Sequence, residues 1–229
     1  MSTKYTKVFF DTEFTGLHQD TTLISIGFTS ECGKTFYAEL NDYDKNQIND
    51  WLKENVLKNL IHNTIDESES YLKTDIVLSG IDSEVYVYGN SDLVRKKIVE
   101  WLNQFGDVKI WSDCLAYDWM LFNNLLADYN NGYPQLPSNI YYIPFDICTL
   151  FEANMIDPDI SREEYLGLKE TKEKHNALYD AIIIKDCYQK LTDVNNNDSL
   201  DKKVMTDYER SLIEAKRKFQ NQLNKLLPV

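Results

Sequence analysis

The sequence predicts a mixed α/β fold, in which a β-sheet of antiparallel and parallel strands is flanked by helices. Two patterns indicate this fold: several β-rich runs come first in the chain, and strand patterns then alternate with helical patterns. In addition, a chain of 229 residues with 43% hydrophobic residues can bury one sizeable core. We therefore expect one domain over residues 1–192, followed by a polar linker and a C-terminal amphipathic helix over residues 193–229.

The first three predicted strands follow one another in antiparallel order. The apolar run KVFF, residues 7–10, predicts the first strand. TLISIGFTS and KTFYAEL lie on either side of the short turn Glu31-Cys32-Gly33 and predict the second and third strands. Residues 61–84 are polar and irregular and predict no element. Between these parts, residues 46–60 predict one helix with an apolar stripe of Ile48, Trp51, Leu52, Val56 and Leu60.

Helices and strands alternate in the next part of the chain. Ser91 is expected to cap a helix over residues 91–105, because a serine side chain can accept a hydrogen bond from a free amide of the first turn. VKIW predicts a short buried strand, and a second helix is expected over residues 115–127. NIYYIPFDI, residues 139–147, predicts another strand, which Pro144 interrupts near its end.

The last part of the predicted domain is helical. Ser161 and Glu164 have the spacing of a capping box at the start of a helix. HNALYDAIIIKDCYQKL, residues 175–191, is strongly apolar and predicts a long helix. A run of asparagine and aspartate at residues 193–201 ends the domain. Residues 201–227 predict an amphipathic helix whose apolar stripe faces the core or a partner.

Charge and composition limit the classes of function. The net charge of −13 argues against a protein that coats long nucleic acids, because such proteins need a basic face. An enzyme that holds a few nucleotides through metal ions is compatible with this charge, since the cations offset part of it. We find neither a membrane-spanning apolar run nor a signal peptide, so we expect a cytoplasmic protein. The four cysteines are widely spaced, which predicts reduced thiols.

Two carboxylates follow the first predicted strand. Asp11 and Glu13 are two residues apart, so they project from the same face at the end of that strand. Two like charges held side by side repel each other unless a cation lies between them or water solvates the strand end. The same spacing recurs at Asp82 and at Asp207. The pair therefore indicates a divalent cation only if ligands from elsewhere in the chain join it.

Three other residues are candidate partners of this pair. His175 and Asp180 are five residues apart, and neither of the other two histidines has an aspartate at this spacing. In a helix their directions differ by about 140°, so they can line one site if His175 lies on the loop or first turn leading into the helix. Asp118 lies early in a predicted helix, where an acidic residue is also stabilised by the positive end of the helix dipole.

Together these segments resemble the motifs of a known family. DTEFTGL, AYDW with Asp118, and HNALYDA with His175 and Asp180 are similar, in this order, to the three motifs of the DEDDh exonucleases. This group contains ribonuclease T, oligoribonuclease and the proofreading exonuclease subunit of DNA polymerase. ISIG and WLKENVLKNL resemble a smaller branch, the bacterial 3′–5′ exoribonucleases with a compact ribonuclease-H-like domain. The resemblance covers about residues 5–191, and Asp113 is a rival for Asp118 in the second motif.

The resemblance implies a two-metal mechanism with Mg²⁺ or Mn²⁺. Two such ions can activate water, stabilise the phosphorus centre and assist the leaving 3′-oxygen, and carboxylates are suitable ligands for them. Asp11 would bridge both ions, Glu13 and Asp180 would hold the ion that activates water, and Asp118 would help to hold the other. His175 would be the general base. A zinc site is disfavoured, because this histidine lacks a second histidine or a cysteine at ligand spacing.

The resemblance also implies contacts with substrate. Phe14, Thr15 and Leu17 are expected to contact the terminal nucleotides, where stacking on an aromatic ring is worth ~1–3 kcal/mol and tolerates any base. For Phe14 and Leu17 the alternative is that both pack the turn.

The expected substrate is RNA, or a short single-stranded nucleic acid, degraded from the 3′ end to nucleoside 5′-monophosphates. DNA as the substrate of the same mechanism is an alternative, and so is a ribonuclease-H-like module that binds protein. A homodimer is expected from the long C-terminal helix and from the family's habit of pairing.

Overall fold

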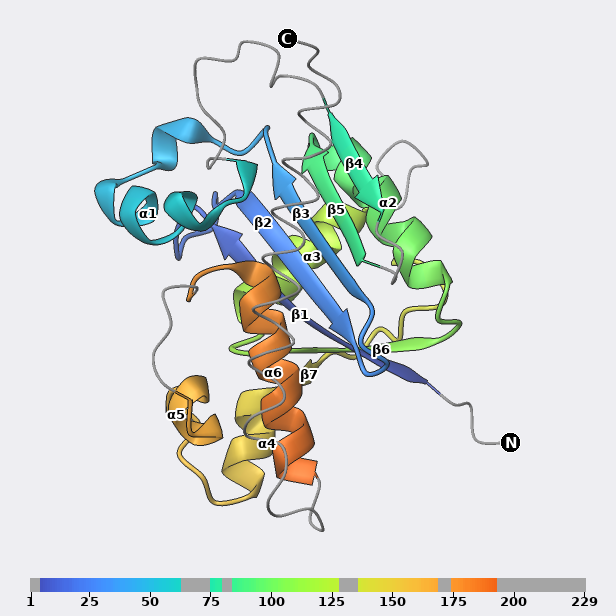
Figure 1. Ribbon diagram of the computed structural model, residues 1–229, viewed down its shortest axis with the longest axis vertical. Coiled ribbons are helices and arrows are strands. Elements are labelled where there is room, and N and C mark those ends of the chain that lie inside the picture. The colour runs from blue at the N-terminus through green and yellow to red at the C-terminus, as the bar shows by residue number, and fades with distance from the viewer. Residues whose placement is uncertain (1–4, 63–74, 80–83, 128–135, 169–173, 193–229) are drawn as a thin grey trace, which may run out of the picture.

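A computed structural model describes residues 5–62, 75–79, 84–127, 136–168 and 174–192 (Figure 1). Within these residues, seven strands form one sheet in the order β4-β5-β3-β2-β1-β6-β7. β1, β2 and β3 pair antiparallel, whereas β6 and β7 continue the sheet parallel to β1. The predicted ribonuclease-H-like mixed sheet is therefore confirmed. The strands are β1 (Thr6–Phe14), β2 (Leu23–Ser30), β3 (Thr35–Leu40), β4 (Ile76–Ser79), β5 (Glu84–Gly89), β6 (Val108–Ser112) and β7 (Phe145–Asp146).

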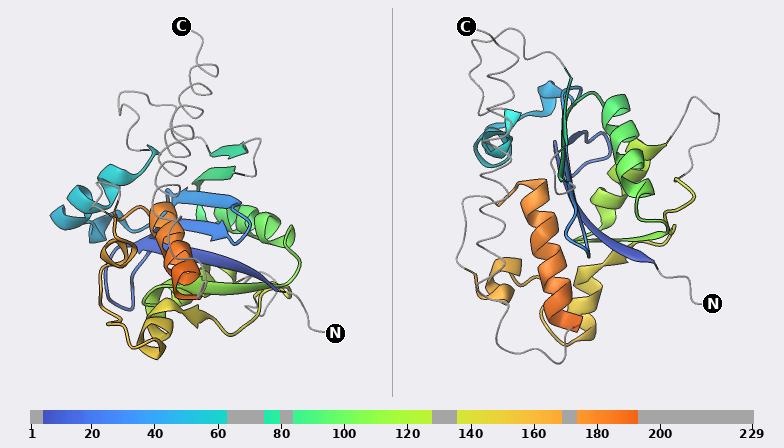
Figure 2. Two further views of the ribbon diagram at one scale, coloured as in Figure 1. Left: turned by 60° about the horizontal axis from the view of Figure 1, so that its bottom comes forward. Right: turned by 45° about the vertical axis from the view of Figure 1, so that its right-hand side comes forward.

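Helices lie on both faces of this sheet (Figure 2). α2 (Ser91–Asn103) and α3 (Ala116–Leu126) cover one face, where they contact β3, β5 and β1. α6 (Ala177–Thr192) covers the other face and contacts β1 and β2, and α4 (Ile147–Ala153) and α5 (Arg162–Leu166) pack against it. None of the described helices is long and apolar enough to cross a membrane.

The alternation of side chains along β1 separates two cores. Phe10 packs with Phe28 and Phe122 on the side of α2 and α3. Phe9, one residue earlier, packs with Phe151 and Tyr179 on the side of α4 and α6. Because side chains alternate along a strand, the odd-numbered positions after Phe9 face α6. This alternation determines which face of the sheet carries the acidic residues of β1.

The first strand is longer than predicted. KVFF predicts a strand that ends at Phe10, but β1 continues to Phe14, because β2 supplies antiparallel partners as far as Leu23. Asp11 and Glu13 therefore lie within the strand, opposite Gly27 and Ser25 of β2 respectively. Their carboxylates share one face of the sheet, as the two-residue spacing predicts.

The prediction of one helix over residues 46–60 is wrong. The segment contains three short helices: η1 (Lys45–Gln47), α1 (Asp50–Asn55) and η2 (Leu57–Asn59). Asn49 has an extended backbone, and its side chain accepts a hydrogen bond of 2.9 Å from Leu52 N–H, so a new helix begins there.

Two other sequence predictions need correction. Asn90 caps α2 in place of Ser91, because Asn90 Oδ1 accepts from Leu93 N–H whereas the N–H and hydroxyl of Ser91 donate to Asp42. The strand predicted over residues 139–147 is reduced to β7 and one isolated bridge at Ile140. Pro144 has no N–H to donate, so the ladder cannot run through it.

The remaining predicted elements are found near their expected positions. β2, β3, β6 and α3 lie where the sequence predicts them, and Ser161 caps α5 by accepting from Glu164 N–H. α6 begins at Ala177, two residues after the predicted start. Strands β4 and β5 were not predicted. The linker and helix expected over residues 193–229 lie outside the described residues.

Candidate active site

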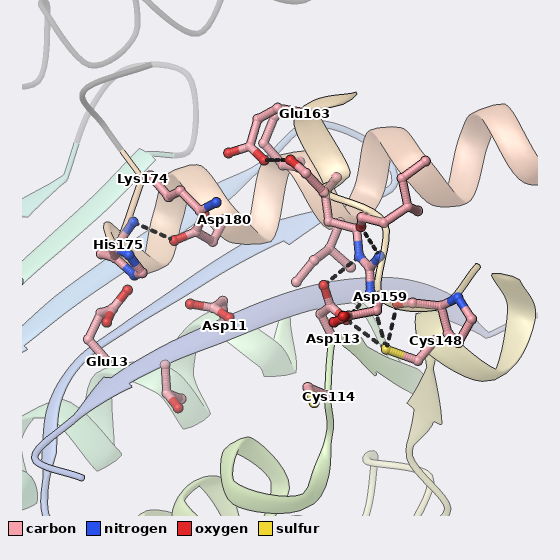
Figure 3. Close-up of a pocket in the computed structure, with 17 residues that line it drawn as sticks. Asp11, Glu13, Asp113, Cys114, Cys148, Asp159, Glu163, Lys174, His175 and Asp180 are labelled. Carbon is pink, nitrogen blue, oxygen red and sulfur yellow. Dashed lines mark hydrogen bonds and ion pairs between the residues drawn. The ribbon is translucent and has the colours of Figure 1, made fainter. Parts of the chain in front are cut away.

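A cavity of about 410 Å³ opens over β1, between the end of β6 and helices α4, α5 and α6 (Figure 3). Asp11 and Glu13 enter it from β1, and His175 and Asp180 enter it from the start of α6. The four groups, which lie in two segments far apart in the sequence, thus line one cavity. The residues that complete the lining are Thr12, Asp113, Cys114, Cys148, Pro158, Asp159, Ile160, Ser161, Arg162, Glu163, Lys174, Ile183 and Ile184.

Three carboxylates converge within this cavity. Oxygen atoms of Asp11, Glu13 and Asp180 all lie within 4.8 Å of one another. Glu13 is buried, and Asp11 and Asp180 are half-buried. The described residues contain no lysine or arginine that forms an ion pair with any of the three.

The approach of α6 to the sheet brings Asp180 to this position. α6 crosses β2 at Gly27, where a Cβ atom would lie 2.3 Å from Leu178 N and 2.4 Å from Ala177 O. Such distances are too short for any side chain, so glycine allows the first turn of α6 to lie directly on the strand. Asp180, in this first turn, then lies above the carboxylates of β1.

His175 lies just before α6, in a left-handed backbone conformation with φ of 66°. This conformation turns its side chain toward the cavity. His175 thus lies on the loop that leads into α6, as the five-residue spacing requires if His175 and Asp180 are to line one site. The backbone N–H of His175 donates to Asp180 Oδ2 at 3.1 Å. The imidazole ring meets the ring of Trp51 edge-on, with centroids 5.2 Å apart. Asn59 Nδ2 donates at 2.8 Å to the backbone oxygen of Lys174, the residue before His175. The imidazole is therefore positioned from α1, η2 and α6.

Burial and mutual repulsion favour the protonated forms of the three carboxyls. The pKa values of Asp11 and Glu13 lie well above the usual range, mainly through burial and then through neighbouring carboxylates. The pKa of Asp180 is raised to about 8 by burial and by the charge of Glu163. An all-oxygen, cation-poor group of this kind fits a hard divalent cation, which would stabilise the ionised forms.

The pKa of the His175 imidazole is shifted in the opposite direction, downward. Burial lowers its pKa below the usual value, and the positive charge of Lys174 lowers it further. The ring is therefore mostly neutral near pH 7 and can accept a proton.

Asp118 is not a member of the converging group. It is 6% exposed on α3, and its carboxylate accepts hydrogen bonds from the hydroxyls of Thr12 and Ser112, the latter at 3.1 Å. Burial raises its pKa to about 7. Among neighbouring charges, that of Asp118 raises the pKa of Asp11 most. Asp118 is thus close to the group, although it does not line the cavity.

Asp113, the alternative to Asp118 in the second motif, lines the cavity but forms an ion pair with Arg162. Arg162 donates to both of its carboxylate oxygens, at 2.7 and 2.8 Å, and Cys148 Sγ donates at 3.0 Å. Asp113, Asp146 and Cys148 also have ligand atoms within 4.8 Å of one another. The guanidinium of Arg162 already supplies positive charge there, so this second group is less suited to a metal ion.

The predicted substrate contacts lie outside the cavity lining. Phe14 stacks on Tyr117 of α3, with centroids 5.5 Å apart, and packs against the core. The Thr15 hydroxyl belongs to the turn, where it accepts from Thr22 N–H at 2.8 Å and donates to Gln47. Leu17 is 76% exposed at the end of the turn. Of the three side chains, that of Leu17 is the most accessible to a ligand.

Sequence reasoning missed three residues around the cavity. Glu163 and Lys174 line it, and Trp51 is 54% exposed beside His175. The helical spacing places Trp51 in an apolar stripe, so the pattern conceals its exposure. Glu163 follows a capping serine, and Lys174 precedes His175, but neither position carries a pattern of its own.

Comparisons with known proteins give one family match. The sequence model of a family described as "3'-5' exoribonuclease Rv2179c-like domain" matches residues 6–192. Among solved structures, the catalytic unit of Neurospora crassa Pan2, with its protease and nuclease domain, is similar at 18% identity and a TM-score of 0.43. The similarity covers 100% of this chain and 31% of that chain, so this chain spans about a third of its length. No curated protein matches.

Proposed function

Because this chain belongs to the 3′–5′ exoribonuclease Rv2179c-like domain family, we propose that it is a metal-dependent exoribonuclease that uses the cavity over β1. It removes nucleotides from the 3′ end of RNA or of short single strands by hydrolysing phosphodiester bonds, and it releases nucleoside 5′-monophosphates. The observation that carries this proposal is the convergence of Asp11, Glu13 and Asp180 within 4.8 Å, with His175 in the same cavity.

Asp11, Glu13, Asp180 and Asp118 would hold the cations. Asp11 is flanked by the other acidic groups and would be suited to contact both ions. Glu13 and Asp180 would hold one ion, and Asp118, bonded to Thr12 and Ser112, would help to hold the other. Mg²⁺ or Mn²⁺ bound there would activate a water molecule and stabilise charge on the phosphate and the leaving oxygen.

His175 is the proposed general base. An imidazole nitrogen accepts the proton from the attacking water, which requires a neutral ring, and the lowered pKa of His175 supports this state. The hydrogen bond from the backbone N–H of His175 to Asp180 Oδ2 holds this residue next to the carboxylate that would bind the ion. The base and the nucleophile are thereby kept together.

The 3′ end of the substrate would enter beside the turn that follows β1. Leu17 is exposed and can wedge against a terminal base, whereas Phe14 already stacks on Tyr117 and can offer only its remaining surface. The Thr15 hydroxyl is engaged in the turn, so Thr15 would contact substrate beside Leu17 rather than through that hydroxyl. The preference for RNA is drawn from the family, which is described as a 3′–5′ exoribonuclease domain.

Digestion of matched RNA and DNA oligonucleotides, each labelled at the 5′ end, tests the proposal. We expect a ladder of shortened RNA with Mn²⁺ or Mg²⁺, nucleoside 5′-monophosphates as products, and no cleavage in EDTA. Faster degradation of DNA would assign the same chemistry to a DNA exonuclease. Absence of cleavage of either strand, together with tight binding of a protein partner, would support the protein-binding module instead.

A further inference from the structure

The cavity contains a fourth carboxylate that the three motifs do not account for. Glu163 lies in α5 and lines the cavity together with Asp11, Glu13 and Asp180 (Figure 3). Its side chain is only 5% exposed. The adjacent Glu164, on the same short helix, is exposed to solvent. The two neighbouring glutamates are therefore in opposite environments.

The protein holds Glu163 in place without neutralising it. Ser161 Oγ donates to Glu163 Oε2 at 2.9 Å, and this bond fixes one oxygen. No lysine or arginine in the described parts of the chain forms an ion pair with Glu163. Lys174 also lines the cavity and its charge lowers the pKa of Asp180, but it forms no ion pair with Glu163. A buried carboxylate without a paired cation is costly, so the positive charge of a cation bound in the cavity would stabilise Glu163.

The nearby arginine does not supply this charge. Arg162 directs its guanidinium to Asp113, Cys148 and the carbonyl oxygens of residues 158 and 160. Two acidic residues of the same cavity thus differ: Asp113 has a bidentate arginine, whereas Glu163 has a hydroxyl. This contrast indicates that the charge of Glu163 serves a bound cation.

The position of Glu163 relative to the converging group indicates how it would act. Both carboxyls line the same cavity, and among neighbouring charges that of Glu163 raises the pKa of Asp180 most. The oxygens of Glu163 are nevertheless outside the group of Asp11, Glu13 and Asp180 that lies within 4.8 Å. A carboxylate at this position would reach a cation through a bound water molecule rather than by direct coordination. Such outer partners typically change metal affinity by 10–100-fold when they are removed.

We propose that Glu163 is a positioning residue of the metal centre, which accepts hydrogen bonds from water on the cation held by Glu13 and Asp180 and strengthens its binding. This inference rests on the proposed function, because it requires a cation at these carboxylates. It adds a residue from α5, an element outside the three motifs, to the centre.

Calorimetric titration of Mn²⁺ into the metal-free protein tests this role without any substrate. We expect Glu163→Gln to weaken Mn²⁺ binding by roughly tenfold or more. Glu164→Gln, the matched control on the exposed side of α5, should bind as the wild type does. Glu163→Asp keeps the charge and should restore affinity to within about threefold of the wild type, whereas Asp180→Asn should weaken binding at least as much as Glu163→Gln.

The outcomes separate this inference from the proposed function. Wild-type affinity in Glu163→Gln, with weakened binding in Asp180→Asn, would overturn the role of Glu163 alone. Equal losses of Mn²⁺ affinity in Glu163→Gln and Glu163→Asp would indicate that Glu163 acts through its packing rather than its charge, and would also overturn its role. Metal-free Glu163→Gln should melt no lower than the wild type, since a buried charge is removed; a variant that fails to fold would contradict the proposal. If the wild type binds no Mn²⁺, both proposals fail.

Discussion

The left-handed backbone at His175 is the feature of a single residue on which the proposed chemistry depends. A φ of 66° is uncommon for a residue other than glycine, and the surrounding structure must hold it. The hydrogen bonds from His175 N–H to Asp180 and from Asn59 to Lys174 O provide that support. Backbone geometry, rather than helix periodicity, directs this imidazole to the carboxylates.

Substitution of His175 should abolish activity without unfolding the protein. We expect His175→Ala to lower kcat by about 10²–10⁴-fold, the usual contribution of a general base. His175→Asn should give a similar loss, and it tolerates the left-handed backbone better, so the two variants together separate chemistry from strain. His62→Ala, which removes a ring that stacks on Tyr88 away from the cavity, serves as the control in the same kinetic assay. Normal turnover by His175→Asn would refute the assigned role.

The pKa of Asp180 predicts how stability changes with pH in the absence of metal. Its folded value of about 8 exceeds the usual value of 3.8, so the folded state binds this proton more tightly. The corresponding stabilisation is complete below the unfolded pKa and is lost as the pH rises through about 8. In EDTA, the melting midpoint should therefore fall between pH 5 and pH 8.5, by roughly 2–4 °C for each kcal/mol lost.

Two comparisons check this pH dependence by calorimetry or circular dichroism. Asp180→Asn removes the titrating group and should make the midpoint less dependent on pH. Added Mn²⁺ should restore the midpoint at high pH, because the cation replaces the protons. A midpoint in EDTA that rises over the same range, or an unchanged slope in Asp180→Asn, would show that this carboxyl does not control stability.

Sequence spacing predicts side-chain placement where it has direct physical meaning. The two-residue interval between Asp11 and Glu13 fixes their common face in any strand, so the shared cavity could be anticipated. The environment of Asp118 could not be anticipated from the sequence. Its hydroxyl partners Thr12 and Ser112 come from β1 and β6, and only the folded sheet brings these strands together.

At the scale of elements, the contact between α6 and β2 controls the geometry of the site. Gly27→Ala would place a Cβ atom 2.3 Å from a backbone nitrogen of α6, so the helix must move. We expect a destabilisation of about 1–3 kcal/mol, measured by denaturant unfolding. The shift displaces Asp180, so activity and Mn²⁺ affinity of the folded fraction should also fall.

Gly33→Ala is the matched control for Gly27→Ala. Gly33 has a φ of 84°, and a Cβ atom there would meet no other atom within 4 Å, so alanine at this position is strained but not crowded. It should cost about 1 kcal/mol and leave the activity of the folded protein unchanged. If Gly27→Ala retains full activity per folded molecule, the helix–strand contact does not set the position of Asp180.

Element boundaries were the least predictable part of the fold. The stripe over residues 46–60 has helical spacing, but Asn49 interrupts the helix by capping α1 with its own side chain. Hydrophobic periodicity cannot detect this competition between a local hydrogen bond and the helix. Similarly, the β-rich composition of residues 139–147 conceals the effect of Pro144 on strand pairing.

At the scale of the whole molecule, topology was predictable where local signals were strong. The three antiparallel strands and the later alternation of strands and helices give the mixed sheet that is observed. β4 and β5 were not predicted, because β5 enters the sheet beside β3 after a polar segment without a clear pattern. Long-range pairing of this kind leaves little trace in the sequence alone.

A homodimer remains a prediction at this scale. The apolar stripe predicted over residues 201–227 lies outside the described residues, and such a stripe can be buried by a second copy of the chain. We expect light scattering at micromolar concentration to give twice the mass of 26.8 kDa. A variant lacking residues 201–229 should be monomeric if this helix forms the contact. A monomeric mass for the full chain would end the hypothesis.

We propose above all that Asp11, Glu13 and Asp180 together bind divalent cations beside His175. Crystals of the protein soaked in Mn²⁺, with diffraction recorded near the manganese absorption edge, test it most directly. We predict anomalous density between these three carboxylates, and its loss in Asp180→Asn crystals treated in the same way. Manganese bound elsewhere, with no density among these carboxylates at a concentration that supports activity, would show that these carboxylates are not the metal centre.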